Sequence, residues 1–544
     1  MNRKTSLERL EQQEFDLCII GGGASGAGCA LDAAARGWKV ALIEQGDFAS
    51  GTSSKSTKLI HGGVRYLEQA VKKLDFSQLK QVRHGLQERY ILLKNAPHLA
   101  RPLPILTPVT SIWEGLYYAV GLQVYGWFVS KKDPLPKSKW LSKAAAKRMF
   151  PALNARFYGA VLYYDGQLDD ARYNLELVLT AEEKGAVVAN YVTCIGFNRD
   201  QQGKITAAIC QNSLADRDST WQLRAKTFLN CTGPFSDTIR ILAHPGIEPR
   251  IRLSKGVHAV LPIASSPCDT AMLIPKTKDG RVVFLIPFQG KWLLGTTDDE
   301  VSNGKGEALL ERKELDYLLE TLNPFLDQPV APDAVLAGFG GYRPLISDYR
   351  AGTKGLLRDH AVELDPYSGL FSLLGGKWTT YRIMAKDAID QIAPLLGREE
   401  QCRTADIPLI GARGLNQADW ERWCQEQDLP KDIAQHLFHC YGACAKEVAN
   451  IMQQSTELAK RIVPGFPFVL AEIKYAVQFE KCCTLRDFLS RRIRLEILDW
   501  KTNLLAIPVV AQVMAKELNW SVSEQQGQSV SYIQLLEGFI QQTI

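Results

Sequence analysis

The chain has 544 residues, more than one hydrophobic core normally serves, so two or three domains are expected. Hydrophobic residues make up 46% of it and charged residues 23%, a composition that excludes a largely disordered protein. The net charge of +5 is compatible with an acidic substrate or an anionic membrane surface, but it is too diffuse to indicate nucleic-acid binding. The N-terminal segment MNRKTSLERLEQQ has no apolar run of the kind found in secretory signals, which favours a cytoplasmic location.

Twelve cysteines are spread along the chain without the spacing of a zinc site. His436 and His439, which lie near Cys440, are therefore expected on an ordinary helix face, and no metal site is predicted. Other cysteines lie in apolar segments, as buried free thiols do in a reducing compartment: Cys18, Cys29, Cys194 and Cys231.

The first motif follows residues 16–20, an apolar segment that predicts a β-strand. Positions 21–26 read GGGASG, a G-x-G-x-x-G turn, and a helix is predicted for residues 27–35. In such a turn the glycines allow a sharp bend, close approach of a pyrophosphate and close packing of helix on strand. The helix N-terminus would hold the phosphates of a dinucleotide. The contacts expected here are Gly21, Gly22, Gly23, Ser25 and Gly26.

A second predicted strand, residues 38–43, ends in Glu44, which stands 23 positions after Gly21. The dinucleotide fingerprint places an acidic residue there to bind a ribose hydroxyl. An acid at this position favours an unphosphorylated ribose, and hence FAD or NAD over NADP.

The loop GTSSKSTK, residues 51–58, distinguishes FAD from NAD. A NAD domain would normally continue into its next helix and strand, whereas this loop is dense in hydroxyl groups and cations. Such a loop suits a long cofactor extended across the fold, and FAD is therefore predicted. The cofactor contacts expected from this region are Thr52, Ser53, Ser54, Ser56 and Leu59.

Residues 59–68, LIHGGVRYLE, place an imidazole and a guanidinium beside two glycines, which permit close approach of the backbone to a ligand. The stretch GTSSKSTKLIHGGVRYLE, together with IIGGGASGAGCALDAAARG before it, resembles the FAD-dependent glycerol-3-phosphate dehydrogenase family. The resemblance covers about residues 14–500, and no D-x-D-x-D-G loop occurs, so it is to the bacterial aerobic type without an EF-hand extension. It continues in four later segments: SKGVH at 254–258, GTTD at 295–298, GYRPL at 341–345 and GGKWTTYR at 375–382.

The resemblance and the residue patterns together predict an α/β fold with three parts. A Rossmann-like FAD-binding domain is expected at 14–110, 155–245 and 340–395, and an antiparallel-sheet substrate region at 111–154 and 246–339. Helical patterns, for example over 473–499, predict a C-terminal helical cap domain at 400–544. Glycines at strand ends, and a strand that passes the adenine in such flavoproteins, add further expected cofactor contacts: Val192, Gly233, Pro234, Gly376, Lys377 and Thr379.

Oxidation of a secondary alcohol beside a phosphomonoester needs cations that hold the phosphate. Arg343 and Arg358 are the leading candidates, since a guanidinium matches phosphate oxygens in pairs and both lie in segments that the resemblance marks as substrate-binding. Arg65, with its neighbour Tyr66, is a further candidate. For any single arginine the ordinary alternative is a surface ion pair.

The reaction also needs a base for the hydroxyl proton. His61 is the leading candidate because a neutral imidazole titrates near working pH, and His258 is the second. A lone histidine is more often structural, so the choice stays open. Lys377 is expected to place its ammonium near the flavin N1 and C2 carbonyl, which makes His61, Arg343 and Lys377 the predicted catalytic set.

Other charged groups are not expected to take part in the reaction. The acidic run at 298–300 is expected to be a solvated loop. Arg491, Arg492 and Arg494 are expected in ion pairs or at the surface.

The most apolar stretch, residues 112–129, is too short for a membrane span of about 20 residues, and Glu114 and Gln123 interrupt it. An aromatic-rich helix followed by lysines can lie in a membrane interface, and a buried helix before a solvated loop is the open alternative. The lysines are Lys131, Lys132, Lys137, Lys139 and Lys143.

The predicted reaction is oxidation of sn-glycerol 3-phosphate to dihydroxyacetone phosphate, with electrons passed to a quinone, in a homo-oligomer that is cytoplasmic or peripheral on the inner face of the membrane. The same oxidation with O₂ as acceptor and H₂O₂ as product stays open. An amino-acid or amine oxidase on the same fold is a third hypothesis, and it would use one arginine for a carboxylate rather than a cluster of cations. A catalytically silent flavin-binding or interaction protein is the alternative from another class.

Overall fold

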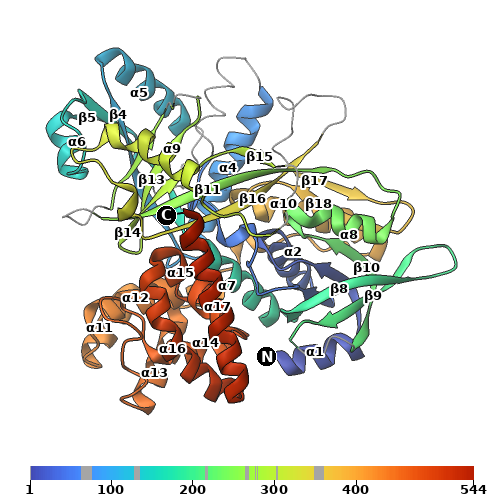
Figure 1. Ribbon diagram of the computed structural model, residues 1–544. Coiled ribbons are helices and arrows are strands. Elements are labelled where there is room, and N and C mark those ends of the chain that lie inside the picture. Colours follow the sequence, from blue (N-terminus) through green and yellow to red (C-terminus); the bar gives the residue numbers. More distant parts are fainter. Residues whose placement is uncertain are drawn as a thin grey trace.

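The computed structural model describes residues 2–62, 76–127, 135–214, 219–263, 269–275, 277, 280–301, 304, 306–347 and 360–543 (Figure 1). Two β-sheets, each with helices packed against it, are joined by a set of C-terminal helices. This is the α/β arrangement that the sequence predicts.

Among the described residues, the first sheet has eight strands in the order β17-β18-β10-β1-β2-β7, with β9 paired to β10 and β8 to β9. Strands β18, β10, β1, β2 and β7 run parallel, so their carboxyl ends meet at one edge. The strands are β1 (Glu14–Ile20), β2 (Val40–Ile43), β7 (Val187–Ala189), β8 (Val192–Arg199), β9 (Ile205–Asn212), β10 (Thr220–Asn230), β17 (His360–Leu364) and β18 (Leu370–Gly375).

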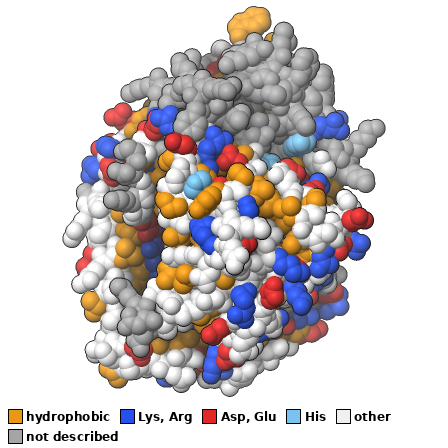
Figure 2. All heavy atoms as spheres, turned by 90° about the vertical axis from the view of Figure 1, so that its right-hand side faces the viewer, with side chains coloured by type: hydrophobic (Ala, Val, Ile, Leu, Met, Phe, Trp, Pro, Cys, Tyr) orange, Lys and Arg blue, Asp and Glu red, His pale blue; other side chains and the backbone are white. Residues whose placement is uncertain are grey.

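Helices cover both faces of this sheet because alternate residues of its strands are apolar on each side. On one face lie α2 (Ala24–Ala35), α7 (Asp170–Glu183) and α10 (Tyr381–Ile392), which share one buried cluster with Leu17, Ile19 and Leu42. On the other lie α1 (Arg3–Gln12) and α8 (Ser236–Ala243). Figure 2, which turns the right-hand side of Figure 1 toward the viewer, shows apolar, basic and acidic side chains interspersed on this side.

The second sheet has ten strands within the described residues, in the order β15-β11-β14-β13-β12-β4-β6-β3, with β16 paired to β11 and β5 to β6. It is antiparallel except where β12 runs beside β4. The strands are β3 (Leu59–Ile60), β4 (Ala100–Val109), β5 (Lys139–Ser142), β6 (Gly159–Leu168), β11 (Ile251–Pro262), β12 (Ala271–Ile274), β13 (Val283–Phe288), β14 (Lys291–Gly295), β15 (Asp299–Val301) and β16 (Ala337–Ile346).

The predicted domain ranges place residues 100–109 and 159–168 with the cofactor domain, whereas β4 and β6 pair with each other in the second sheet. The division of the chain into domains stays a prediction. Helices α4 (Phe76–Asn95), α5 (Ile112–Trp127), α6 (Lys143–Met149) and α9 (Arg312–Leu322) complete this half of the molecule.

Helices dominate beyond residue 400, as the sequence predicts; α14 to α17 pack on the second sheet through a common apolar cluster, and α11 to α13 form a cluster of their own with α14. The segment 473–499 is not one helix, because α14 ends at Phe479 and a π-helical turn spans Asp487–Arg492. The helices are α11 (Gln417–Glu426), α12 (Lys431–Tyr441), α13 (Ala445–Gln454), α14 (Leu470–Phe479), α15 (Leu495–Leu498), α16 (Trp500–Leu518) and α17 (Val522–Thr543).

A buried ion-pair cluster joins the π-helical turn to the first sheet. Arg491 Nε and Arg492 Nη1 each donate to one carboxylate oxygen of Asp47 at 2.6 Å, and Asn190 donates to the other at 3.1 Å. Burial opposes ionisation of Asp47, but the charges of Arg492 and Arg491 outweigh it and lower its pKa to about 2.

Arg494 makes a second connection from the helical region, to the loop after β2. Its guanidinium donates to Asp170 Oδ1 at 2.9 Å and to the carbonyl of Ser54 at 2.8 Å. Lys58 donates to the other Asp170 oxygen at 2.7 Å and also to the Ser54 carbonyl. Arg491, Arg492 and Arg494 are all buried, so the ion-pair prediction is confirmed and the surface alternative is wrong.

We expect Asp47→Asn to lower the free energy of unfolding by about 3–5 kcal/mol, because it removes the carboxylate that two buried guanidinium groups share and leaves Arg491 only Asp487, and Arg492 only Glu480, as a counter-charge. Calorimetric unfolding of the holoprotein measures this. The matched control is Asp432→Asn, which removes the ion pair that Asp432 forms with Arg461 at the surface at 2.7 Å and should cost no more than about 1 kcal/mol. Equal effects of the two substitutions would contradict a structural role for the buried cluster.

Candidate functional site

The glycine turn between β1 and α2 has the backbone that its sequence motif predicts. Gly21 has a φ of +109°, and a Cβ there would lie 2.7 Å from the carbonyl oxygen of Cys231. A Cβ on Gly26 would collide with the carbonyl of Gly21. Gly23 caps α2 with no side-chain hydrogen bond, and the next amide, Ala24 N, donates to Ser53 Oγ at 2.9 Å. The turn therefore lets a ligand approach the backbone closely at the N-terminus of α2, where an anion can bind.

Glu44 lies at the carboxyl end of β2, beside this turn. Its carboxylate accepts the N–H groups of Gly22 at 2.6 Å and Gly46 at 2.9 Å, and its carbonyl accepts Val192 N at 2.8 Å. Burial raises the pKa of Glu44, and the two amide donors counteract that effect. The structure thus brings Gly22, Glu44 and Val192 together, as a ribose and adenine site requires.

The hydroxyl-rich loop is held to both halves of the molecule. Thr52 Oγ1 donates to the carbonyl of Tyr342 at 2.6 Å, Trp378 Nε1 donates to the carbonyl of Ser53 at 2.8 Å, and Ser56 Oγ donates to Asp170 at 2.7 Å. The hydroxyl groups of Thr52 and Ser56 therefore help to hold the loop in its conformation. Cofactor contact stays a prediction for Thr52, Ser53, Ser54 and Ser56.

Two further glycine turns follow strands of the same sheet. Gly233 and Pro234 begin a 3₁₀ turn after β10; Gly375 ends β18 and Gly376 follows it, with φ values of +69° and +88°. Lys377 comes next and caps a second 3₁₀ turn, Trp378–Thr380. Because β1, β10 and β18 are parallel, all three turns lie at one sheet edge, where a dinucleotide binds in open α/β sheets. These backbone turns fit FAD.

His61 follows β3, in which Leu59 is buried, and its backbone N–H donates to Thr379 Oγ1 at 3.4 Å. This contact brings it to the turn that follows Lys377. Burial, and then the charges of Lys377 and Arg89, lower the pKa of the His61 imidazole to about 4. The ring is consequently neutral at neutral pH and able to accept a proton.

His258 lies in β11, on the other side of the hydroxyl-rich loop. Its Nε2 shares a hydrogen bond with Thr57 Oγ1 at 3.0 Å, and its ring stacks on Phe339 with a centroid distance of 4.8 Å. Burial, and then the charges of Lys58 and Arg343, hold the pKa of His258 well below its ordinary value. Both candidate bases are thus neutral imidazoles, and the choice between them stays open.

Arg343 extends from β16, and the turn after β14 holds its guanidinium. Nη1 donates to the carbonyl of Thr297 at 3.1 Å and to Asp298 Oδ1 at 3.0 Å, while Nη2 donates to Thr296 Oγ1 at 2.9 Å. Ser254 Oγ donates to the same Asp298 oxygen. Residues 298–300 are exposed, as expected, and Asp298 lies in a loop where it pairs with Arg343, but the expectation of a loop is wrong for Asp299 and Glu300, which begin β15. Arg65, Tyr66 and Arg358 lie outside the described residues.

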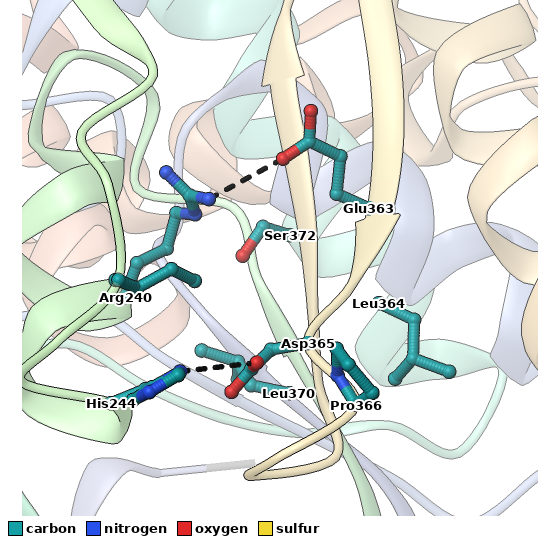
Figure 3. Close-up of a pocket in the computed structure, with 9 residues that line it drawn as sticks. Arg240, His244, Glu363, Leu364, Asp365, Pro366, Leu370 and Ser372 are labelled. Carbon is teal, nitrogen blue, oxygen red and sulfur yellow. Dashed lines mark hydrogen bonds and ion pairs between the residues drawn. The ribbon is translucent and has the colours of Figure 1, made fainter.

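A cavity of about 320 Å³ lies elsewhere on the first sheet, between α8 and the β17–β18 hairpin (Figure 3). Its charged groups are already paired, Arg240 with Glu363 at 3.4 Å and His244 with Asp365 at 3.3 Å. Its β18 residue Leu370 begins the strand, whereas the glycine turns follow the strand's end. This cavity is separate from the cofactor edge.

Histidines of the helical region are engaged within it. His436 lies on α12, where its Nε2 pairs with Glu472 at 2.6 Å. Across the described part of the chain, no group of three or more histidine, cysteine or acidic side chains is arranged to hold a metal ion.

Motif reasoning missed Asp170, Arg494 and Trp378, which hold the hydroxyl-rich loop. Asp170 and Arg494 are separated from the loop by more than a hundred residues of sequence and carry no motif of their own. The basic run RRIR at 491–494 is the one local signal, and it indicates charge but not a partner.

Known proteins match the chain along most of its length. Residues 16–382 match the FAD dependent oxidoreductase family, and residues 402–525 match the C-terminal domain of alpha-glycerophosphate oxidase. A probable mitochondrial glycerol-3-phosphate dehydrogenase of Caenorhabditis elegans is 41% identical over 97% of this chain and 74% of that protein. The human mitochondrial glycerol-3-phosphate dehydrogenase is 40% identical over the same shares.

The chain belongs to the FAD-dependent glycerol-3-phosphate dehydrogenase family. The structure of the glycerol-3-phosphate dehydrogenase of Bacillus halodurans complexed with FAD agrees, with a TM-score of 0.80 and 29% identity over 98% of this chain and 97% of that one. An L-alpha-glycerophosphate oxidase of Mycoplasma pneumoniae, at 15% identity and a TM-score of 0.56, shares the fold. The family resemblance, the fold class, the enzyme class and FAD as cofactor are thereby confirmed.

Proposed function

We propose that this chain oxidises sn-glycerol 3-phosphate to dihydroxyacetone phosphate and passes the electrons to a quinone. The observation that carries the proposal is the position of His61, whose backbone N–H donates to Thr379 in the turn after Lys377, at the glycine edge of the first sheet. Arg343 stands on the adjoining sheet, whose strand β16 is bonded to the hydroxyl-rich loop through Thr52. FAD, when bound at the glycine turns, supplies the hydride acceptor.

In this proposal His61 takes the proton of the C2 hydroxyl on a ring nitrogen. A pKa near 4 makes the ring a weak base, because burial and two cations disfavour the imidazolium. A phosphate dianion bound close by would offset the charges of Lys377 and Arg89 and so raise the pKa of His61, while the effect of burial would persist. The substrate would thus strengthen the base that acts on it.

Arg343 binds the phosphate in the same proposal. A guanidinium offers pairs of N–H donors to phosphate oxygens, and its hydrogen bonds to Thr296, Thr297 and Asp298 orient it before substrate arrives. Arg65, Arg358 and Tyr66 are the further phosphate ligands that the resemblance implies. A cluster of cations favours a phosphate over the single carboxylate of an amino acid, which disfavours the amino-acid oxidase hypothesis.

A quinone acceptor is favoured over O₂ by an exposed apolar surface. Trp113 on α5 is 80% exposed, and Ile112, Leu116 and Tyr117 beside it are more than half exposed. Trp140 of β5 packs against α5 at Gly115, and Lys137, Lys139 and Lys143 are exposed in the same region, at the upper left of Figure 1. Aromatic side chains beside lysines suit a membrane interface. None of the helices searched in the described residues is long and apolar enough to cross a bilayer.

The first test is anaerobic reduction of the bound flavin. Glycerol 3-phosphate should bleach its visible absorbance, whereas glycerol and a D-amino acid should not, because neither supplies a phosphate. Re-oxidation of the bleached protein by a soluble quinone should then be much faster than re-oxidation by air. Rapid re-oxidation in air with release of H₂O₂ would favour the oxidase hypothesis. If none of these compounds bleaches the flavin, the hypothesis of a catalytically silent flavin-binding protein remains.

The two histidines can be separated by substitution. We expect His61→Asn to lower kcat by about 100- to 10,000-fold, the usual contribution of a general base, with FAD retained. His258→Asn should have a smaller effect on kcat, because its Nε2 is already bonded to Thr57. Single-turnover flavin reduction in each variant measures the step. The reverse order of effects would assign the base to His258.

Membrane contact can be tested by sedimentation with vesicles that contain phosphatidylglycerol. Trp113→Glu should weaken binding several-fold, since it adds a charge to the apolar surface on α5. The matched control is Leu505→Glu on α16, where the native side chain is 73% exposed at another part of the molecule. If the protein does not sediment with the vesicles, or if both substitutions weaken its binding equally, this surface is not the membrane contact.

A further inference from the structure

The guanidinium of Arg343 lies across a glycine. In the pairing of β11 with β16, Ser254 is opposite Arg343 and Gly256 is opposite Gly341. Side chains two residues apart share a face of a strand, so Gly256 and Ser254 face the same side as Arg343. A Cβ built on Gly256 would lie 2.6 Å from Cζ and 2.7 Å from Nη1 of Arg343. The guanidinium therefore occupies the space that any other residue would fill.

We propose that Gly256 is a positioning residue for substrate binding. Because Gly256 has no side chain, the guanidinium of Arg343 can lie directly on β11 at this point. The proposal rests on the proposed role of Arg343 as a phosphate ligand. It gives the glycine of the SKGVH segment a physical function, which the motif alone leaves unexplained.

Three hydrogen-bond acceptors hold the guanidinium of Arg343 in this position on β11. Thr296 Oγ1 accepts from Nη2, and the carbonyl of Thr297 and the carboxylate of Asp298 accept from Nη1. Asp298 is itself held by Ser254, the residue opposite Arg343. A guanidinium lifted off the strand cannot keep all three hydrogen bonds in their present geometry, because each depends on the direction of its donor.

An added methyl group should affect binding more than folding. The atoms that it meets are the far end of a long, flexible side chain, which can swing away at small cost to stability. Those same atoms are the ones that the proposal assigns to the phosphate. Gly256→Ala should therefore displace a functional group while the sheet stays intact.

The experiment compares Gly256→Ala with Gly338→Ala in the holoenzyme. Gly338 lies in the same strand as Arg343, and a Cβ there would meet the side chain of Leu310 at 2.6 Å instead of a cation. Gly256→Ala should raise the KM for glycerol 3-phosphate roughly tenfold or more, as expected when a charge-assisted hydrogen bond is misplaced, with FAD content and kcat at saturation little changed. Gly338→Ala should leave KM unchanged.

A double-substitution cycle with Arg343→Ala decides how Gly256 acts. If it acts through Arg343, Gly256→Ala should add almost nothing to the loss of kcat/KM in Arg343→Ala. Full additivity, an unchanged KM in Gly256→Ala, or loss of FAD from that variant would each overturn the proposal. Failure of the wild-type protein to oxidise glycerol 3-phosphate would instead overturn the proposed function, so the two failures are distinguishable.

Discussion

The site depends on one buried carboxylate, Asp170, and the cations that surround it. Lys58 and Arg494 each bind one of its oxygens, and both also donate to the carbonyl of Ser54. Ser56 completes the cluster through its hydroxyl and its amide. Moving such charges out of water is costly, so their value lies in specifying one loop conformation more than in net stability. Because Arg494 comes from the helical region, the conformation of the hydroxyl-rich loop depends in part on a contact with that region.

The same loop also determines where the two sheets meet. Thr52 bonds the carbonyl of Tyr342, the residue before Arg343, while the carbonyl of Ser53 accepts from Trp378, the residue after Lys377. The two predicted catalytic cations, Arg343 and Lys377, thus each neighbour a residue that is hydrogen-bonded to this loop, at Thr52 and Ser53. The spacing between the glycine turns and Arg343 therefore depends on two hydrogen bonds from buried or half-buried side chains to backbone carbonyls.

Local chemistry explains which features the sequence could predict. The glycine turn at 21–26, the acid at Glu44 and the helices beyond residue 400 are each specified within a few residues. The strand at 100–109 joins the other sheet because of its partner β6, more than fifty residues later, and no local pattern indicates that pairing. The pairing of the exposed Asp298 with Arg343 was not predicted for a related reason, since its partner comes from another strand. Residue types were readable from the sequence, but their long-range partners were not.

Electrostatics links substrate choice to catalysis in this arrangement. Burial is the largest cause that lowers the pKa of both imidazoles; the charges of Lys377 and Arg89 lower that of His61 further, and those of Lys58 and Arg343 that of His258. A neutral polyol would leave those charges unchanged and would meet a base too weak to act. In the proposed reaction a phosphate dianion would compensate part of that positive charge as it binds, and the proton that leaves the alcohol would then meet a stronger acceptor. The phosphate group would thus serve as a counter-ion for the base as well as a handle for binding, which couples recognition to the chemical step.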